Sequence, residues 1–209
     1  MPVYVDEALI VLDKPAGLLT VPGRGPDKAD CLVARVQARY PDALVVHRLD
    51  MDTSGLVAMA RGPDAQRVLS RAFAERRVTK RYVALVAGRL PPPDAEWGTV
   101  DLPLVCDWPN RPLQKVDFAS GKPSVTRWRV LDYDATMDAT RVELMPVTGR
   151  SHQLRVHMRA LGHALLGDPL YAPLAVRERA PRLLLHAAGL ALPHPRTGAV
   201  CAFESPLPF

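Results

Sequence analysis

One acidic residue, Asp50, lies in a short polar segment whose residue types could carry out chemistry. The segment comprises residues 47–55 (HRLDMDTSG), between an apolar run at residues 43–46 and a second one at residues 55–60. Two strands flanking a polar loop that a glycine closes would present Asp50 at the mouth of a sheet, where functional residues are common. Asp, Thr, Ser and Gly also form turns readily, so an ordinary turn is the alternative interpretation.

A second charged residue, Arg150, is placed at or just before the start of a helix that is expected to end at Gly162. The positive end of the helix dipole disfavours a cation there. A nearby carboxylate or phosphate would remove this penalty, and Asp50 is the candidate carboxylate. The alternative is a solvated arginine that loses roughly a few tenths of a kcal/mol.

Basic side chains are concentrated between residues 61 and 89. The chain of 209 residues carries a net charge of +5, and this segment alone holds eight basic residues against two acidic ones. Such a concentrated patch suggests a polyanionic partner. An arginine-rich composition from a GC-rich genome is the alternative, and basic residues at a helix C-terminus also complement the helix dipole. The eight residues are Arg61, Arg67, Arg71, Arg76, Arg77, Lys80, Arg81 and Arg89.

Several functional classes lack the motifs they require. The six histidines show no ligand spacing, and no phosphate-binding glycine motif is present, so we expect neither a metal nor a nucleotide cofactor. Asp50 and Asp52 lie too close in sequence to flank a sugar as a glycosidase pair. Three scattered cysteines, the acidic N-terminus and the lack of a membrane-length apolar run predict a cytoplasmic protein without a membrane association. No obligate protein partner is inferred.

Hydrophobic periodicity predicts the elements that position these residues. We expect strands at 3–13 with a turn at Asp6 and Glu7, at 18–21, on both sides of the Asp50 segment, at 80–87, 124–131, 140–145, 183–190 and 199–203. Helices are expected at 30–40 with Asp30 as N-cap, from 62 to about 75, before Gly162 and at 175–180. The helix from residue 62 should bury Val68, Leu69, Ala72 and Phe73, and the helix before Gly162 should bury Leu154, Met158 and Leu161 and expose His152, Arg155 and Arg159.

Residues 88–123 are dominated by proline and glycine and are expected to form a long loop. Trp108, Arg111 and Lys115 in this loop have the types that contact nucleic acid. A tryptophan that pins the loop to the core is an equally good interpretation. With no repeat and no linker, residues 1–209 are interpreted as one α/β domain.

Four segments in order resemble the RluA-type pseudouridine synthases: residues 13–21 (DKPAGLLTV), 47–55 (HRLDMDTSG), 80–82 (KRY) and 149–157 (GRSHQLRVH), the last followed by 167–168 (GD) and 184–187 (LLHA). Residues 101–116 resemble the short RluA subgroup, which modifies a tRNA anticodon-arm uridine and a large-subunit rRNA loop uridine. Ser151 and Leu154 replace the more frequent Thr and Ile. An S4-like N-terminal domain is not expected, because the opening strand begins near Val3.

The resemblance implies an α+β fold: a large mixed, mostly antiparallel sheet with flanking helices and a central catalytic cleft. It also implies that Asp50 is the catalytic carboxylate, which attacks the ribose or removes a proton from it without any cofactor. Arg150 would pair with Asp50 and favour its ionised form. Tyr82 would stack on the uracil and is the candidate to accept the C5 proton, and Arg48 would fill the gap left by the flipped base.

Structured RNA is the implied partner, as a tRNA anticodon stem-loop and a large-subunit rRNA hairpin. A non-catalytic RNA-binding protein or chaperone with the same basic surface is the alternative, and a nuclease or nucleosidase using Asp50 is a third hypothesis. The candidate RNA contacts are His47, Arg48, Thr53, Arg67, Arg71, Arg76, Arg77, Lys80, Arg111, Lys115, His152 and Arg155.

Overall fold

The computed structural model describes residues 2–23, 25 and 29–209. The chain forms two compact units, Met1–Lys80 with His186–Pro208 and Arg81–Leu185 with Phe209. Within the described residues, no helix combines the length and the apolar character that crossing a membrane requires.

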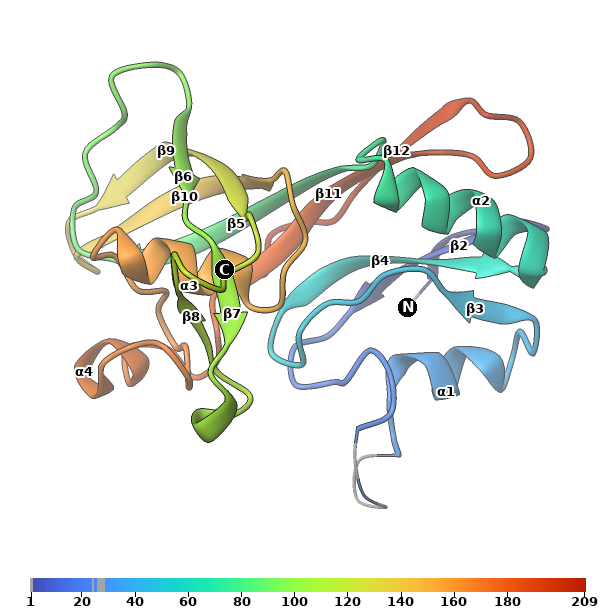
Figure 1. The fold of residues 1–209 in the computed structure, drawn as a ribbon, viewed down its shortest axis with the longest axis horizontal. Helices are drawn as coiled ribbons and strands as arrows, with labels where there is room; N and C mark the ends of the chain where they lie inside the picture. Colours follow the sequence, from blue (N-terminus) through green and yellow to red (C-terminus); the bar gives the residue numbers. More distant parts are fainter. Residues whose placement is uncertain (1, 24, 26–28) are drawn as a thin grey trace. The chain divides into compact units, whose positions relative to one another are not determined.

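The first unit is built on a mixed sheet. Its strands run in the order β1 (Pro2–Val5), β2 (Leu9–Lys14), β4 (Ser54–Arg61) and β11 (Leu185–Pro193), with β3 (Ala43–Val45) beside β4 and β12 (Val200–Glu204) beside β11 (Figure 1). β4 and β11 are parallel, whereas the other pairs in this unit are antiparallel. The strands predicted on both sides of the Asp50 segment are confirmed as β3 and β4.

Helix α2 (Gly62–Ala74) covers one face of this sheet. Ala65, Leu69 and Ala72 form its buried stripe, packed on alternate residues of β2, β4 and β11. The expected stripe was partly wrong, because Val68 lies beside it and is 40% exposed. Pro63 lies in the first turn of the helix, where its missing N–H causes no loss.

Two expectations near the N-terminus were wrong. Helix α1 (Leu32–Gln37) is shorter than predicted, and Asp30 pairs with Arg35 at 2.7 Å instead of capping the helix. Residues 18–21 form a loop, because Thr20 bonds to the Asp50 segment and its carbonyl accepts the Val33 N–H of α1.

The second unit has its own strands, in the order β5 (Thr79–Ala87), β10 (Ala139–Pro146), β9 (Val125–Asp134) and β6 (Gly98–Asp101), with antiparallel neighbours. The strands predicted at residues 124–131 and 140–145 are confirmed as β9 and β10. Helix α4 (Leu174–Arg177) packs through Val176 against a small core that includes Leu85, Leu166 and Leu184.

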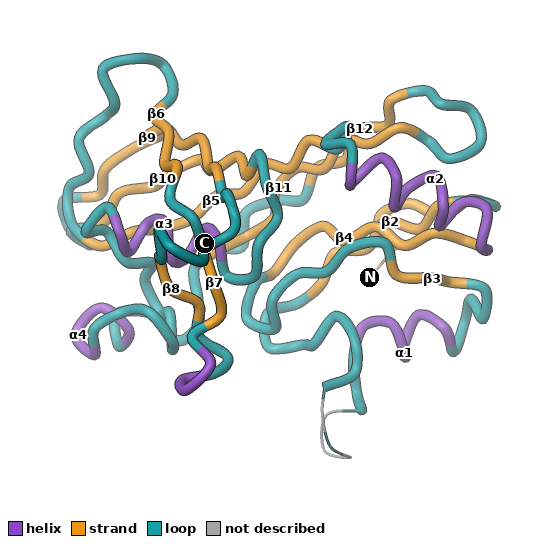
Figure 2. Tube along the Cα trace, viewed as in Figure 1, coloured by secondary structure: helices purple, strands orange, loops and turns teal. Residues whose placement is uncertain are grey.

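The long loop predicted at 88–123 was only partly correct. Besides β6 it contains a hairpin of β7 (Leu104–Cys106) and β8 (Gln114–Val116), with one turn of 3₁₀ helix, η2 (Trp108–Asn110), at its tip (Figure 2). The prolines lie beside these short strands rather than within them, which is why the composition indicated a loop.

Helix α3 (Gln153–Ala160) is confirmed, and Gly162 follows it with a φ of +87° as expected for a helix stop. Leu154 and Met158 are buried as predicted. Leu161 is 36% exposed, contrary to the prediction, because the helix ends one residue before it.

Candidate active site

The backbone of the Asp50 segment is held by residues near the N-terminus of the chain. Lys14 is fully buried at the end of β2, and its Nζ donates to the carbonyl oxygens of Pro15, Leu18 and Met51 at 2.9, 2.7 and 2.8 Å. The Thr20 hydroxyl donates to the Leu49 carbonyl at 2.8 Å and accepts the Leu49 N–H at 3.2 Å. The residues on both sides of Asp50 are therefore fixed by hydrogen bonds.

Lys14 also brings a positive charge close to the acidic residues of the loop. Burial lowers the pKa of Lys14 to about 8, although the negative charges of Asp52 and Asp50 act in the opposite direction. The ammonium group remains mostly protonated at neutral pH and helps to offset the two neighbouring carboxylates.

At the other end of the segment, a chain of four polar side chains joins three strands and the C-terminal residues of the first unit. Ser54 Oγ lies 2.9 Å from His186 Nδ1, His186 Nε2 lies 3.0 Å from Ser205 Oγ, and Ser205 donates to Asp13 at 2.6 Å. Because the Ser205 proton goes to Asp13, His186 donates from Nε2 to Ser205, and a neutral ring then accepts the Ser54 proton at Nδ1. This chain fixes the start of β4, four residues after Asp50.

Gly55 has a specific steric reason to be glycine. Its φ is +109°, and a Cβ at this position would lie 2.4 Å from the backbone oxygen of Ala187, its partner on β11. Only glycine permits the close approach of β4 and β11 immediately after the Asp50 loop.

His47 and Thr53, both expected to contact RNA, each have a hydrogen-bond partner inside the first unit. His47 Nε2 accepts the Ala58 N–H at 2.9 Å, and its ring stacks on Phe73 with centroids 4.5 Å apart. Burial, with a smaller contribution from the charge of Lys80, lowers the pKa of His47 to about 3, so the ring is neutral. Thr53 is 2% exposed, and its N–H donates to the Asp50 carbonyl. The RNA contact predicted at Thr53 is wrong because this side chain is buried, whereas the contacts predicted at the half-buried His47 and the exposed Arg48 stay predictions.

The second unit holds Arg150 on a short, tightly bonded loop before α3. Gln153 Oε1 accepts both the Thr148 hydroxyl and the Arg150 N–H, at 2.7 and 3.0 Å, and Gln153 Nε2 donates to Val125. Arg150 itself is exposed, and its Nε donates to the Pro123 carbonyl at 3.3 Å. The prediction that Arg150 precedes the helix is confirmed.

His152 ends this loop in an unusual conformation. Its φ is +54°, in the left-handed backbone region that residues other than glycine rarely adopt. Its Nδ1 lies 2.6 Å from the Tyr171 hydroxyl. The same hydroxyl accepts the Gln114 N–H of β8 at 2.8 Å. Tyr171 thus connects the Arg150 loop to the β7–β8 hairpin.

Arg155 corrects another expectation. It is 2% exposed and forms a two-pronged ion pair with Asp168, which is fully buried, at 2.8 and 2.5 Å. Asp168 also accepts the N–H groups of Leu170 and Tyr171. Arg155 is therefore a structural residue that orders the turn carrying Tyr171, and the prediction that it lies on an exposed RNA-binding face is wrong.

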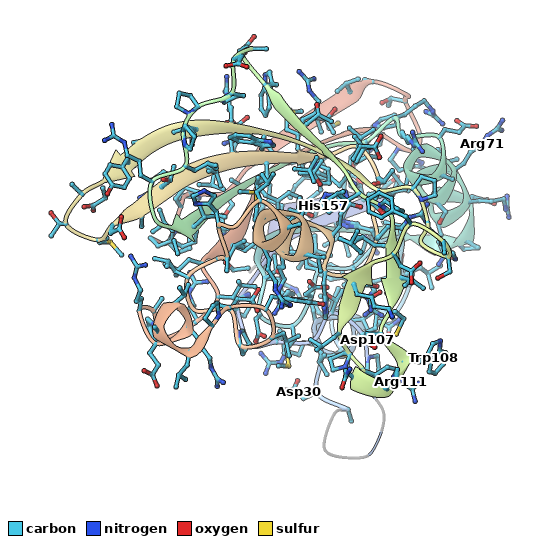
Figure 3. The ribbon with its side chains drawn as sticks, turned by 60° about the vertical axis from the view of Figure 1, so that its left-hand side comes forward. Asp30, Arg71, Asp107, Trp108, Arg111 and His157 are labelled. Carbon is cyan, nitrogen blue, oxygen red and sulfur yellow. The ribbon has the colours of Figure 1, made fainter. Side chains whose placement is uncertain are left out.

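The remaining candidates are distributed between the units. Tyr82 lies on β5 beside Leu144 of β10 and is 9% exposed. The arginines of α2 and the turn after it are exposed, as Figure 3 shows for Arg71, and acidic neighbours partly neutralise three of them: Arg67 pairs with Asp64, and Arg71 and Arg77 pair with Glu75. Lys80 is half-buried, and burial lowers its pKa.

Comparison with known proteins decides the family. Residues 8–160 match the model of the RNA pseudouridylate synthase family, which covers most of the chain. The chain belongs to this family. Its relatives include the dual-specificity RNA pseudouridine synthase RluA of Escherichia coli strain K12, 52% identical over 206 residues and covering 99% of this chain and 92% of that protein. RluA of Yersinia pestis is 48% identical over 201 residues, which is 96% of both chains.

Solved structures agree with this assignment. Human RNA pseudouridylate synthase domain containing 1 matches 100% of this chain and 83% of its own with a TM-score of 0.80 at 30% identity. Human RNA pseudouridylate synthase domain containing 4 matches 99% and 88% with a TM-score of 0.77 at 25% identity. The predicted family, the α+β fold with its mixed, mostly antiparallel sheet, and the enzyme class are confirmed, so this protein is an RNA pseudouridine synthase.

Within this pseudouridine synthase, the sequence analysis missed the side chains that hold the site. Lys14, His186 and Gln153 all lie in the motifs that carried the resemblance. The motifs therefore marked these residues, but they did not indicate which hydrogen bonds the residues form. His157 is a similar case: its Nδ1 accepts from Thr126 and its Nε2 donates to the Leu102 carbonyl, at 2.9 and 3.0 Å. Burial lowers the pKa of His157, which fits this neutral structural ring.

Proposed function

We propose that this pseudouridine synthase isomerises uridines in two kinds of RNA, a tRNA anticodon arm and a loop of large-subunit rRNA. Relatives that are about half identical over nearly the whole chain bear the name dual-specificity RNA pseudouridine synthase. The hairpin segment that resembles their subgroup, residues 101–116, supports the same assignment. We further propose that residues 1–209 act as one catalytic domain, in the cytoplasm, where three free cysteines are compatible with reducing conditions.

Asp50 is the catalytic residue in this proposal, and the observation that carries it is the hydrogen-bonded loop around it. Both chemical routes, attack on the ribose and removal of a ribose proton, need an ionised carboxylate in a defined position. The loop is held by Lys14 and Thr20 before Ser54 begins β4, so the carboxylate is presented on a rigid frame. The reaction breaks the C1′–N1 bond and joins C1′ to C5, while C5 loses its proton and N1 gains one, with no net oxidation or reduction.

Three further residues have roles that the family resemblance supports. Arg150 pairs with the Asp50 carboxylate and favours its charged form. Tyr82 stacks on the uracil, and Arg48 occupies the gap that the flipped nucleotide leaves. Flipping costs a few kcal/mol, and stacking of roughly 1–3 kcal/mol per base offsets much of it.

Substrate RNA binds mainly through exposed arginine and lysine side chains in this proposal. Their exposure and positive charge suit the phosphate backbone, whose contacts position an RNA without reading its sequence. Thr53 and Arg155 are removed from the set because both side chains are buried. The exposed proposed contacts are Arg48, Arg67, Arg71, Arg76, Arg77, Arg111 and Lys115, and the half-buried ones are His47, Lys80 and His152.

The experiment compares the wild type with Asp50→Asn and with Asp52→Asn, a matched change two residues along the same loop. Pseudouridine is mapped in bulk tRNA and rRNA from cells that lack the enzyme, and RNA affinity is measured in parallel. We expect Asp50→Asn to lose at least about 10²-fold in rate, as removal of a proton-transfer group or nucleophile does, while binding is retained. Asp52→Asn should keep most of the rate.

Each rival hypothesis predicts a different result. Wild-type protein that binds RNA tightly but forms no pseudouridine would support an RNA-binding protein or chaperone. Strand cleavage or release of free uracil would support a nuclease or nucleosidase. Modification of rRNA alone, or of tRNA alone, would leave the isomerase and refute the dual specificity.

A further inference from the structure

An exposed tryptophan at the tip of the β7–β8 hairpin has no structural role in the core. Trp108 is 67% exposed, so the interpretation that it pins this segment to the core is wrong. The guanidinium of Arg111 lies over its ring, 4.2 Å from the ring centroid, and Figure 3 shows the two side chains together at the outer end of the hairpin. We infer that Trp108 and Arg111 form a stacking platform for an unpaired nucleobase of the substrate RNA, an inference that rests on the proposed function.

The hairpin tip is an ordered support for this platform. The Asp107 N–H donates to the Leu113 carbonyl at 2.9 Å, and Asp107 accepts from Asn110 through both its backbone carbonyl and its carboxylate, at 3.0 and 2.9 Å. The Leu113 N–H donates to the Asn110 carbonyl at 3.0 Å. The turn of helix that carries Trp108 is therefore closed at both ends, and little backbone entropy remains to be lost when a ligand binds.

The base of the hairpin is anchored in the second unit. Leu104 is 3% exposed and belongs to a small core with Val156 of α3 and Tyr171. The Tyr171 hydroxyl accepts the Gln114 N–H of β8 and also contacts His152, two residues after Arg150. The platform is thus built on the same anchor as the Arg150 loop, so an RNA held at the tip is held in register with that loop.

The chemistry of the tip selects the ligand. A large exposed aromatic ring is unusual on a protein surface, and aromatic rings with arginine guanidinium planes are the groups on which unpaired RNA bases stack. Lys115 on β8 is exposed and supplies a cation for the adjoining phosphate. An apolar protein partner would instead need a wider apolar patch. At this tip, the guanidinium of Arg111 already lies over the exposed Trp108 ring.

The test uses Trp108→Ala, Trp108→Phe and a matched control, Trp97→Ala. Trp97 also carries arginines over its ring, Arg127 at 5.0 Å and Arg129 at 4.7 Å, but precedes β6 rather than lying in the hairpin. The probe is a fluorescein-labelled anticodon stem-loop transcript, and each loop nucleotide is replaced in turn by an abasic one. Affinity and the steady-state constants for pseudouridine formation are measured for each combination of protein variant and transcript.

We expect Trp108→Ala to weaken binding by roughly 5- to 150-fold, the range for loss of one stacked base, and to raise KM more than it lowers kcat. Trp108→Phe should restore most of the affinity, and Trp97→Ala should change neither constant. One abasic position should weaken wild-type binding and leave Trp108→Ala unaffected. The dependence of affinity on salt should stay the same in Trp108→Ala, because stacking releases no counterions, and should decrease in Lys115→Ala.

Two results would overturn the platform: unchanged affinity and KM in Trp108→Ala, or no abasic position at which the effect of this variant disappears. An equal loss in Trp97→Ala would also refute it, because the effect would then not belong to the hairpin. These outcomes differ from failure of the proposed function, in which the wild type binds the transcript with the predicted Trp108 dependence but forms no pseudouridine in it.

Discussion

Breaking the buried ion pair between Arg155 and Asp168 should destabilise this protein strongly. Both side chains are almost fully buried, so replacing one partner leaves the other as an uncompensated charge away from water. Such single replacements cost about 3–5 kcal/mol, a large part of the roughly 5–15 kcal/mol that keeps a domain folded. We therefore expect Asp168→Asn and Arg155→Met each to lower the melting temperature by roughly 6–20 °C, at about 2–4 °C per kcal/mol.

The double variant Arg155→Met/Asp168→Leu distinguishes a buried pair from two independent contributions. Because apolar groups of similar size often replace a buried pair at little cost, the double variant should be more stable than Asp168→Asn. Part of the loss should remain, since Asp168 also accepts the N–H groups of Leu170 and Tyr171. Unfolding in urea at pH 7 gives the free energies, and the coupling energy follows from the wild type, Arg155→Met, Asp168→Leu and the double variant.

RNA binding provides the decisive readout for this pair. If Arg155 is structural, the folded double variant should bind the transcript with the same salt dependence as the wild type, because no phosphate contact is lost. Two results would refute the reasoning: a loss of less than about 1 kcal/mol in Asp168→Asn, or a reduced salt dependence in a fully folded double variant.

Three other changes test the frame around Asp50, each measured by urea unfolding. Gly55→Ala should cost about 3 kcal/mol or more, because strain at a positive φ adds to the collision with Ala187, whereas Gly17→Ala, at a φ of +80° in open space, should cost only about 1–2 kcal/mol. Lys14→Met should lower the free energy of unfolding by about 2 kcal/mol or more. Each carbonyl oxygen that loses its hydrogen-bond donor costs roughly 1–3 kcal/mol, and removal of the buried charge offsets part of this loss. The folded-state pKa of His47, about 3, lies below its ordinary value of 6.5, so the unfolded state binds a proton more readily between these pH values. The free energy of unfolding should therefore fall as pH decreases from 6.5 towards 3. The fall should exceed that of His47→Gln by at most about 1.4 kcal/mol per pH unit.

Contrary outcomes are as specific. Equal costs for the two glycine variants would show that strand approach at Gly55 is unimportant, and an unchanged Lys14→Met would show that its three carbonyl partners have other donors. Parallel pH profiles for the wild type and His47→Gln would show that His47 becomes protonated as easily in the folded state as in the unfolded one.

The sequence by itself determined the order and type of most elements, the family and the candidate catalytic residue. Strand and helix patterns are local, so the apolar runs of β4 and β5, the alternation in β9 and β10 and the proline at the start of α2 could be interpreted without a partner. Asp50 was identified because the motif spells the family signature, which requires no tertiary information. The composition of 88–123 was misleading, since short strands between prolines leave little periodicity to detect.

Tertiary structure alone decided which polar residues are used inside the protein. Arg155 and Thr53 were both predicted to contact RNA, but their side chains are buried. Arg155 pairs with Asp168, and the Thr53 N–H donates to the Asp50 carbonyl within its own loop. Burial depends on what packs over a residue, so a single sequence cannot report it, and the same reason explains why Trp108 could be assigned to the surface only from the structure.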